Sequence, residues 1–410
     1  MLMPATRVRP AQSMREKTAA VLAALLIGFF TVSAVSVDRL KDDVTWLAAP
    51  DRQGRRSGTP AAAAAAEYIA GRFTELGFDV QFQEFGNNRR NVVATSGTAE
   101  RQILIGAHYD GQGPGMPSAS DNAAGVAVML EIARELKTTE LPVSLVVIAF
   151  DDEEQGLNGS RYYSDHPLYP LEKVEAAIVF DTMGRSFLDL PEWTLFVLGS
   201  EYSAELAAIV QNRARPDMLV AGADLIGPRS DFAPFAFKRV PFLFFSNATH
   251  KDYHGSGDTP DRVDYSRLGG DAALIAQIVE DIAHTGTTPA YRTEPVYPSG
   301  EANGLIRAID LIRENRKDLP SAYALMLEDL KARLRIDPSR EVRRLGATAL
   351  LALATPRLSS FMLTFILGPF YERDGRPGIA SAIYEEALKW TADASSRAEL
   401  EAKIKTIQGL

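Results

Sequence analysis

Short apolar runs alternate with segments of helical periodicity along the first two thirds of the chain. Val143 to Phe150 is an apolar run bounded by polar residues, which is typical of a strand buried on both faces of a sheet. The runs that we expect to be strands are 78–85, 91–95, 103–107, 143–150, 174–180, 195–198 and 240–245. Helical patterns separate many of them, so the sequence predicts an α/β fold with a mostly parallel mixed sheet sandwiched by helices.

The predicted helices have recognisable start and stop signals. Thr59 can cap a helix whose first position is Pro60, and Gly77 can end it. The segment before it, 51–57 (DRQGRRS), is polar and is expected to be mobile. Further helices are expected over 121–137, 201–213 and 265–283.

The pattern changes after His284. Residues 285–300 are rich in Thr, Pro, Tyr and Gly and predict a linker between a catalytic domain, 38–284, and a C-terminal all-helical region, 301–410. Prolines punctuate that region at 320, 338, 356 and 377. Its apolar stretch 345–367 is split by Pro356 and is too short on either side to span a membrane. We interpret it as the core of a helical bundle, with a groove for a partner or a membrane surface as the alternative.

The N-terminus carries an uncharged run, 18–37, behind Arg7, Arg9, Arg15 and Lys17. This arrangement predicts that residues 1–37 form either a cleaved signal peptide, with Val32-Ser33-Ala34 as the cleavage site, or a retained membrane anchor. In either case the remainder is expected to be exported to the periplasm or the extracellular space, and residues 18–37 could associate with the membrane. A buried core helix is the third interpretation.

Composition narrows the chemistry. The net charge is -9 and no basic stripe is present, which argues against nucleic acid as a partner. The chain has no cysteine, so any metal must be bound by His, Asp or Glu. The oligomeric state is left open by these features.

Histidines and acids gather in segments that mostly follow strand-like runs. These segments are ILIGAHYD (103–110), SDNAAG (120–125), DDEEQGLNG (151–159), IVFDTMG (178–184) and HKDYHGSGDTPD (250–261). Ligand sites in α/β sheets lie beyond the carboxyl ends of the strands. The five segments are therefore expected to meet at one edge of the sheet.

Each segment also has a structural interpretation. His108 and Asp110 share a face of an extended stretch, and such a pair is often structural. Asp121 could be a helix N-cap, and Asp181 a solvated turn acid. The four acids 151–154 could form a solvated turn, but repulsion and burial make such a cluster costly, and a bound cation offsets that cost.

The last segment supplies a second imidazole. His250 and His254 are spaced as in H-E-x-x-H, but Lys251 stands where that motif needs glutamate, so the zincin interpretation is rejected. His254 remains the candidate ligand, whereas His166 and His284 are expected to be structural. Two imidazoles and three carboxylates suit zinc or a similar divalent ion.

Charge counting favours two zinc ions. Their four positive charges would face three negative charges from Asp121, Glu154 and Asp181, and a bridging hydroxide would balance the site. One neighbouring carboxylate would remain for proton transfer.

With these motifs the chain resembles the M28 family of dizinc aminopeptidases over about residues 47–283. The segments that carry the resemblance are GRRSGTPAAAAAAEYIAGRFTELGF, AHYD, SASDNAAGVAVMLEIAREL, FDDEEQGLNGSRYY, FDTMG and YHGSGDTPDRVD, in that order. The resemblance implies a phosphorylase/hydrolase-like zinc peptidase fold and two zinc ions per chain.

The resemblance also implies roles for individual residues. His108 and Asp181 would bind one zinc, and Glu154 and His254 the other. Asp121 would bridge both ions and precede a non-proline cis peptide bond. Glu153 would be the general base, with Asp110 as the partner that orients His108.

The implied reaction is hydrolysis of N-terminal residues from peptides with a free N-terminus. A water bridging the two metals would lose its proton to Glu153, which would pass it to the leaving amine. The chain departs from many relatives at Phe232, where they carry a histidine after the pair Ser230-Asp231. That departure bears on substrate preference and leaves the metal ligands unchanged.

Other functions stay open at this point. The chain could be another M28-like enzyme, such as a glutaminyl cyclase or a carboxypeptidase acting on acidic dipeptides, although SDNAAG paired with EEQGLNGS favours an aminopeptidase. It could also be a non-catalytic scaffold whose working part is the C-terminal helical region.

Overall fold

The computed structural model describes residues 35–298, 300–354 and 356–409, and places Val35–Leu410 in one compact unit. The predicted leader, including its Val32-Ser33-Ala34 cleavage site, lies outside the described residues except for positions 35–37. Within the part that is described, no helix has both the length and the apolar character to span a membrane.

A mixed eight-stranded sheet forms the centre, in the order β1-β2-β4-β3-β5-β8-β6-β7. The strands are β1 (Asp79–Glu84), β2 (Arg90–Ser96), β3 (Gln102–His108), β4 (Ser144–Phe150), β5 (Val174–Phe180), β6 (Leu195–Leu198), β7 (Met218–Ala221) and β8 (Phe242–Ser246). The neighbours β4, β3, β5 and β8 are parallel, whereas β1, β2 and β6 add antiparallel pairs. The predicted fold class is confirmed; β7 was not predicted.

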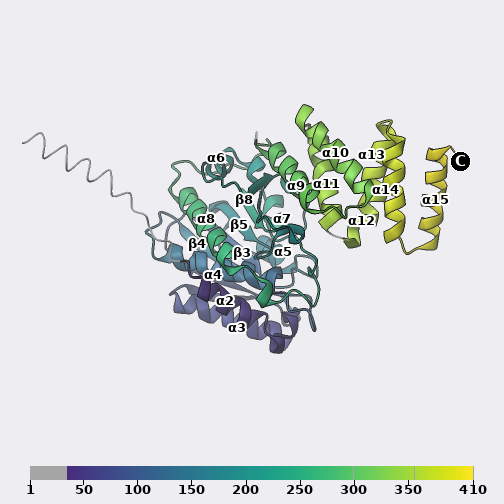
Figure 1. Cartoon of the computed structure of the whole chain (residues 1–410). Coiled ribbons are helices and arrows are strands. Elements are labelled where there is room, and N and C mark those ends of the chain that lie inside the picture. The colour runs from purple at the N-terminus through teal and green to yellow at the C-terminus, as the bar shows by residue number, and fades with distance from the viewer. Residues whose placement is uncertain (1–34, 299, 355, 410) are drawn as a thin grey trace, which may run out of the picture. The chain divides into compact units, whose positions relative to one another are not determined.

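Helices cover both faces of the sheet because successive strand residues point to opposite sides. Ile105 and Val147 pack in a core with α2 (Val37–Leu47), α3 (Pro60–Glu75), α4 (Ala124–Lys137), α6 (Ala204–Asn212) and α8 (Tyr265–His284) (Figure 1). Their neighbours Leu104 and Val146 point into a second core with α5 (Asn158–Asp165), α7 (Phe232–Phe237) and the C-terminal helices.

The first predicted helix has the expected boundaries. The Thr59 hydroxyl accepts a hydrogen bond from the Ala62 N–H at 3.3 Å, Pro60 is the first residue, and α3 ends at Glu75, just before Gly77. The second begins later than predicted, because Asp121 and Asn122 have non-helical backbone angles and α4 starts at Ala124. Asp121 is therefore part of the turn 119–123 rather than the first residue of a helix.

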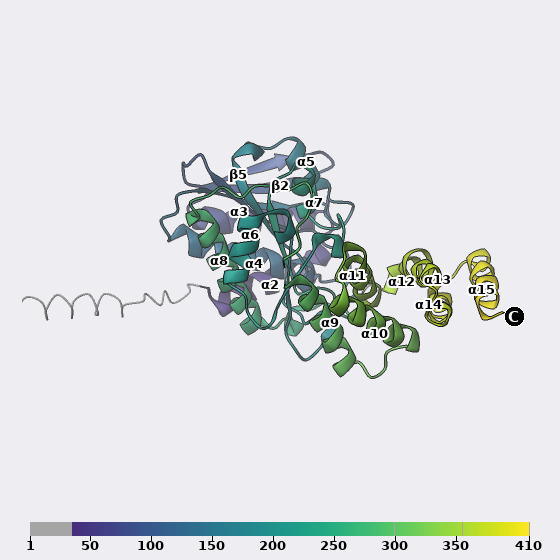
Figure 2. The same cartoon turned by 90° about the horizontal axis from the view of Figure 1, so that it is seen from above.

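The C-terminal region is helical, as predicted (Figure 2). Its helices are α9 (Glu301–Asn315), α10 (Ser321–Ile336), α11 (Arg340–Ala354), α12 (Pro356–Met362), α13 (Gly368–Arg373), α14 (Pro377–Trp390) and α15 (Ala394–Gln408). Leu345, Leu350, Leu363 and Leu367 are buried, consistent with the predicted bundle core. The region shares the second core with the sheet, because Leu305 and Ile309 of α9 belong to the same cluster as Phe242 and Phe244 of β8.

The predicted linker is held against the sheet domain. The N–H groups of Arg292 and Val296 donate to the carbonyl oxygens of Tyr202 and Glu201 at 2.7 and 2.8 Å. The domain boundaries 38–284, 285–300 and 301–410 remain a proposal, in which the last two segments pack on the first.

The parallel strands bring the predicted site residues to one edge. His108 is the last residue of β3 and pairs in register with Phe150, the last residue of β4. Phe180, the last residue of β5, pairs with both Ala107 and Phe245. The segments that follow these strands therefore start side by side.

A candidate dimetal site at the carboxyl edge of the sheet

The structure brings two groups of imidazole and carboxylate side chains together at this edge. His108, Glu153 and Asp181 form one group, and Asp121, Glu154 and His254 form the other. Within each group the potential ligand atoms lie within 4.8 Å of one another. All seven residues singled out from the sequence, including Asp110, are at or beside these groups.

The first group centres on a buried imidazole. The Nε2 atom of His108 lies 3.3 Å from Asp121 Oδ1 and 3.4 Å from Asp181 Oδ1. The other oxygen of Asp181 accepts a hydrogen bond from the Ser230 hydroxyl at 2.8 Å. One ring N–H cannot satisfy two carboxylates, so this nitrogen is better placed to share a cation with them.

The second group repeats the arrangement around the other imidazole. The Nε2 atom of His254 lies 2.9 Å from Asp121 Oδ2 and 3.3 Å from Glu154 Oε2. Tyr253 stacks on this ring with centroids 3.9 Å apart. Asp121 thus presents one oxygen to each histidine, which is the position required of a bridging ligand.

The donor set fits zinc by composition and by spacing. Zinc bonds of about 2.0–2.1 Å in a tetrahedral site separate the ligand atoms by roughly 3.3 Å. The 3.3 and 3.4 Å separations around His108 and the 3.3 Å separation between His254 and Glu154 match that value, whereas the 2.9 Å separation between His254 and Asp121 is shorter. In addition, Glu154 Oε1 is buried without a hydrogen-bond partner. Buried acids in this arrangement are stable when a cation neutralises them.

The acid pair 153–154 has unusual electrostatics. Burial raises the pKa of Glu153 well above its ordinary value. Burial, followed by the charge of Asp121, raises the pKa of Glu154 to about 10. Groups perturbed in this way are common at functional sites.

Asp110 has a broader role than the sequence indicated. Its backbone carbonyl lies 3.2 Å from His108 Nδ1, and its carboxylate lies 3.5 Å away. The same carboxylate accepts hydrogen bonds from the N–H groups of Glu153 at 3.0 Å and Glu154 at 3.3 Å. Asp110 therefore positions both the imidazole and the loop with the acid pair.

The turn that carries Asp121 has its own supports. A cis peptide bond joins Asp121 to Asn122, as the family resemblance predicted. The buried Asp258 carboxylate accepts hydrogen bonds from the Ser120 hydroxyl at 2.8 Å, the Ser120 N–H at 3.0 Å and the Asp121 N–H at 3.2 Å. Asn122 donates to the Phe180 carbonyl at 2.9 Å, and Gly125 is needed beneath it because a Cβ there would lie 2.0 Å from Asn122 Oδ1.

Four further residues escaped the sequence analysis. Gln112 donates to Glu154 and lies 3.2 Å from His254 Nε2, Thr182 donates to Asp181 at 3.0 Å, and Asp258 supports the turn. Arg55 was assigned to a mobile polar stretch. That interpretation is wrong, because Arg55 is fully buried and its guanidinium donates to four backbone carbonyls. Only the spacing of the motifs was visible in sequence; the partners of isolated polar residues were not.

Two further features also lie near the cluster: His250, which the sequence analysis rejected as a ligand, and the segment 230–232, where the chain departs from many relatives. His250 Nε2 lies 2.7 Å from the Ser120 hydroxyl, and burial lowers the pKa of His250 to about 4. Asp231, which precedes Phe232, is buried, and burial raises its pKa to about 7. His250 thus supports the Asp121 turn. It lies outside the two groups described above and forms a separate group of potential ligand atoms with Asp189 and Asp252.

The comparisons with known proteins agree with this geometry. Residues 91–279 match the model of peptidase family M28. Aminopeptidase YwaD of Bacillus subtilis is 41% identical over 186 residues, covering 43% of this chain and 40% of the relative. The alkaline phosphatase isozyme conversion protein of Escherichia coli is 31% identical over 138 residues, covering 26% of this chain and 40% of the relative. The chain thus spans about two fifths of the length of these two curated relatives.

Solved structures share the fold. The aminopeptidase from Aneurinibacillus sp. strain AM-1 has a TM-score of 0.53 and 17% identity, covering 64% of this chain and 97% of that one. A glutaminyl cyclase from Porphyromonas gingivalis has a TM-score of 0.52 and 22% identity, covering 60% of this chain and 98% of that one. Both likenesses establish architecture alone. The helices after residue 300 lie beyond the family match, which ends at 279.

Proposed function

We propose, from the match of residues 91–279 to the model of peptidase family M28, that the chain is a zinc-dependent exopeptidase that hydrolyses N-terminal residues from peptides. One observation carries the proposal: Asp121 presents its two carboxylate oxygens to two separate imidazoles, each flanked by a further carboxylate. The relative YwaD, named an aminopeptidase, supports the N-terminal direction of attack.

The ligand assignment follows the two groups. His108 and Asp181 would hold one zinc, Glu154 and His254 the other, and Asp121 both. When bound, such a pair polarises a carbonyl and makes water acidic enough to attack it near neutral pH.

The remaining side chains move and position the proton. Glu153 offers a carboxylate oxygen within 4.8 Å of a ring nitrogen of His108 and of a carboxylate oxygen of Asp181. In our assignment Glu153 belongs to this group but does not coordinate the metal. It takes the proton of the attacking water and returns it to the leaving amine nitrogen. Asp110 keeps this carboxylate in place through the Glu153 N–H.

The decisive experiment is a panel of aminoacyl anilides with the zinc-loaded chain, with and without a chelator. We expect release of the aniline that stops on chelation and returns with added zinc. Cyclisation of N-terminal glutamine would instead identify a cyclase, and cleavage of an acidic C-terminal residue a carboxypeptidase. No turnover, together with fewer than one zinc per chain, would identify a scaffold.

A variant pair tests the proton transfer. Glu153→Gln should lower kcat by at least about 100-fold, in line with the usual contribution of a general base, while zinc content stays unchanged. Glu172→Gln is the matched control, because this exposed acid lies just before β5, at the opposite end of the strand from Asp181. Near-normal turnover by Glu153→Gln would refute the assignment.

Location and partners belong to the same proposal. We propose that the enzyme is exported, acts on peptides with a free N-terminus, and is either released or anchored through residues 18–37. The basic residues ahead of that run support this proposal. Fractionation of cells, with sequencing of the mature N-terminus, would distinguish the two forms.

A further inference from the structure

A pocket continues from the candidate metal site toward the C-terminal region. Asp181 of the first ligand group and Tyr253, which stacks on His254, both line it. It encloses a cavity of about 100 Å³, within a wider space of about 760 Å³ that includes open solvent. A residue bound at the metal site would therefore have this pocket next to it.

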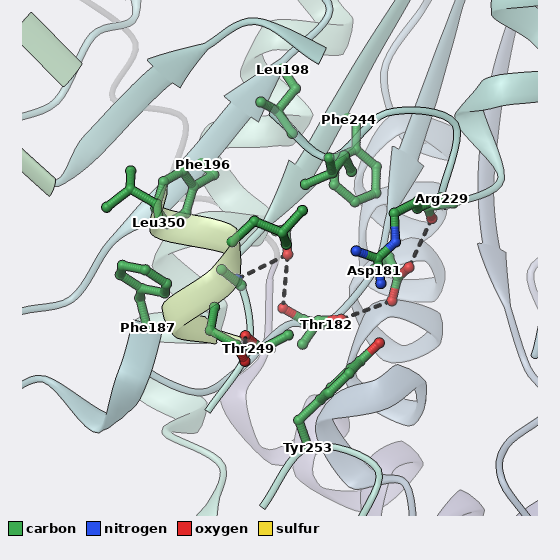
Figure 3. Close-up of a pocket in the computed structure, with 16 residues that line it drawn as sticks. Asp181, Thr182, Phe187, Phe196, Leu198, Arg229, Phe244, Thr249, Tyr253 and Leu350 are labelled. Atoms are coloured by element: carbon green, nitrogen blue, oxygen red, sulfur yellow. Dashed lines mark hydrogen bonds between the residues drawn. The ribbon is translucent and has the colours of Figure 1, made fainter. Parts of the chain in front are cut away.

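The pocket is apolar away from the metal site. Its apolar walls are Phe187, Phe196, Leu198, Ile226, Phe244, Ala248, Leu350, Leu351 and Ala354. Its charged lining residues are Asp181 and Arg229, and Figure 3 shows these two side by side, apart from Phe187, Phe196 and Leu350. A buried apolar side chain would thus meet hydrocarbon at the far end.

One wall comes from outside the family match. Leu350, Leu351 and Ala354 belong to α11, whereas that match ends at residue 279. The helix is attached at its end, where the Thr249 hydroxyl donates to the Ala354 carbonyl at 2.9 Å. Near its start, Arg343 pairs with the buried Glu301 of α9. The wall is therefore held in place from both ends.

We propose that α11 closes the pocket that receives the side chain of the first substrate residue, so that the C-terminal helical region selects large apolar N-termini. This inference rests on the proposed exopeptidase function. Contact with Leu350 and Leu351 favours leucine or phenylalanine because burial of hydrocarbon is favourable, whereas alanine would leave the far end of the pocket unfilled. A basic residue would find no acid there beyond Asp181.

The size of the effect can be stated as a ratio. A single methylene in an apolar pocket is worth about 10- to 200-fold in kcat/KM. The full chain, loaded with zinc, should therefore cleave leucyl anilide at least about 10-fold better than alanyl anilide. Leu351→Ala should reduce this ratio several-fold, chiefly by lowering kcat/KM for the leucyl substrate.

Two further variants test whether the effect comes from the pocket-facing side of α11. Ala354→Leu adds volume to the same wall, so it should lower kcat/KM for phenylalanyl anilide more than for alanyl anilide. Leu353→Ala is the matched control, because Leu353 lies on α11 and is partly buried in the same core without lining the pocket. Its ratio should equal that of the wild type.

Calorimetry gives a readout that does not need turnover. Leucinamide should bind more tightly than glycinamide, and Leu351→Ala should weaken leucinamide binding while leaving glycinamide unchanged. If no anilide is cleaved but this binding pattern is seen, the exopeptidase function is refuted while the proposed role of α11 in the pocket is supported. If anilides are cleaved but Leu351→Ala changes kcat/KM for all substrates equally or for none, the role of α11 is refuted and the exopeptidase function is supported. A preference for acidic residues at Arg229 would also overturn it.

Discussion

Replacing Arg55 by lysine keeps a positive charge but removes the geometry that supports the metal-site loops. The guanidinium donates to the carbonyls of Leu47 at 2.6 Å, Ser118 at 2.8 Å, and Tyr109 and Pro117 at 3.0 Å. These acceptors are distributed over three nitrogen atoms, whereas an ammonium offers at most three hydrogen bonds from one point.

The magnitude follows from the carbonyls that lose their donor. We expect Arg55→Lys to leave two of them without a partner, at about 1–3 kcal/mol each. The free energy of unfolding should fall by about 2–6 kcal/mol, a large share of the roughly 5–15 kcal/mol typical of folded proteins. Tyr109 follows His108 and Ser118 opens the turn with Asp121, so zinc affinity should fall as well.

Urea unfolding followed by circular dichroism measures this change. Arg56→Lys is the control, because this neighbouring arginine is exposed and should tolerate lysine within about 0.5 kcal/mol. If the two variants unfolded at the same urea concentration, the four carbonyl contacts would not be stabilising the loops, and our account of Arg55 would be refuted.

Three further changes test the site and its supports. Asp121→Asn should lower zinc content at both positions, because each imidazole faces one Asp121 oxygen; full occupancy by metal analysis would exclude a bridging role. Gly54→Ala should destabilise the fold by more than about 1 kcal/mol in thermal melts, because Gly54 has a φ of +67° and a Cβ there would lie 2.0 Å from the Gly113 carbonyl oxygen. An unchanged melting temperature would contradict this. Removing zinc with a chelator should lower the melting temperature and added zinc should restore it, because an ion at 1,000 times its dissociation constant adds about 4 kcal/mol; equal melts would argue against a structural metal.

The elements that the sequence predicted well have strong local signals. The runs 174–180 and 195–198 coincide with β5 and β6, and prolines at 356 and 377 open α12 and α14. The missed elements include β7 and α2. β7 is as short as the predicted β6, so its length does not explain why it was missed. α2, VDRLKDDVTWL, is rich in charge because just one side of it is buried against α4 and α8.

The residues of the candidate site also fall into those that the sequence revealed and those that it did not. His108, Asp121, Glu153, Glu154, Asp181 and His254 were found because each stands in a motif, and four of them lie within four residues of the end of a strand-like run. Arg55, Gln112 and Asp258 were not found, because nothing in their local sequence indicates which backbone groups or ligands they contact. Their roles arise from pairs more than 40 residues apart, such as Gln112 with Glu154 and Asp258 with Ser120.

The sequence by itself determined the α/β class, the family resemblance and the chemical types at the site, because apolar periodicity and short motifs are local properties. Only the tertiary structure decided the strand order, which strand pairs are antiparallel, and the distances at which the two imidazoles face Asp121. It also placed α11 against the pocket. These features depend on packing between distant segments, whose free energy is shared among many contacts and is not written in any one stretch of the chain.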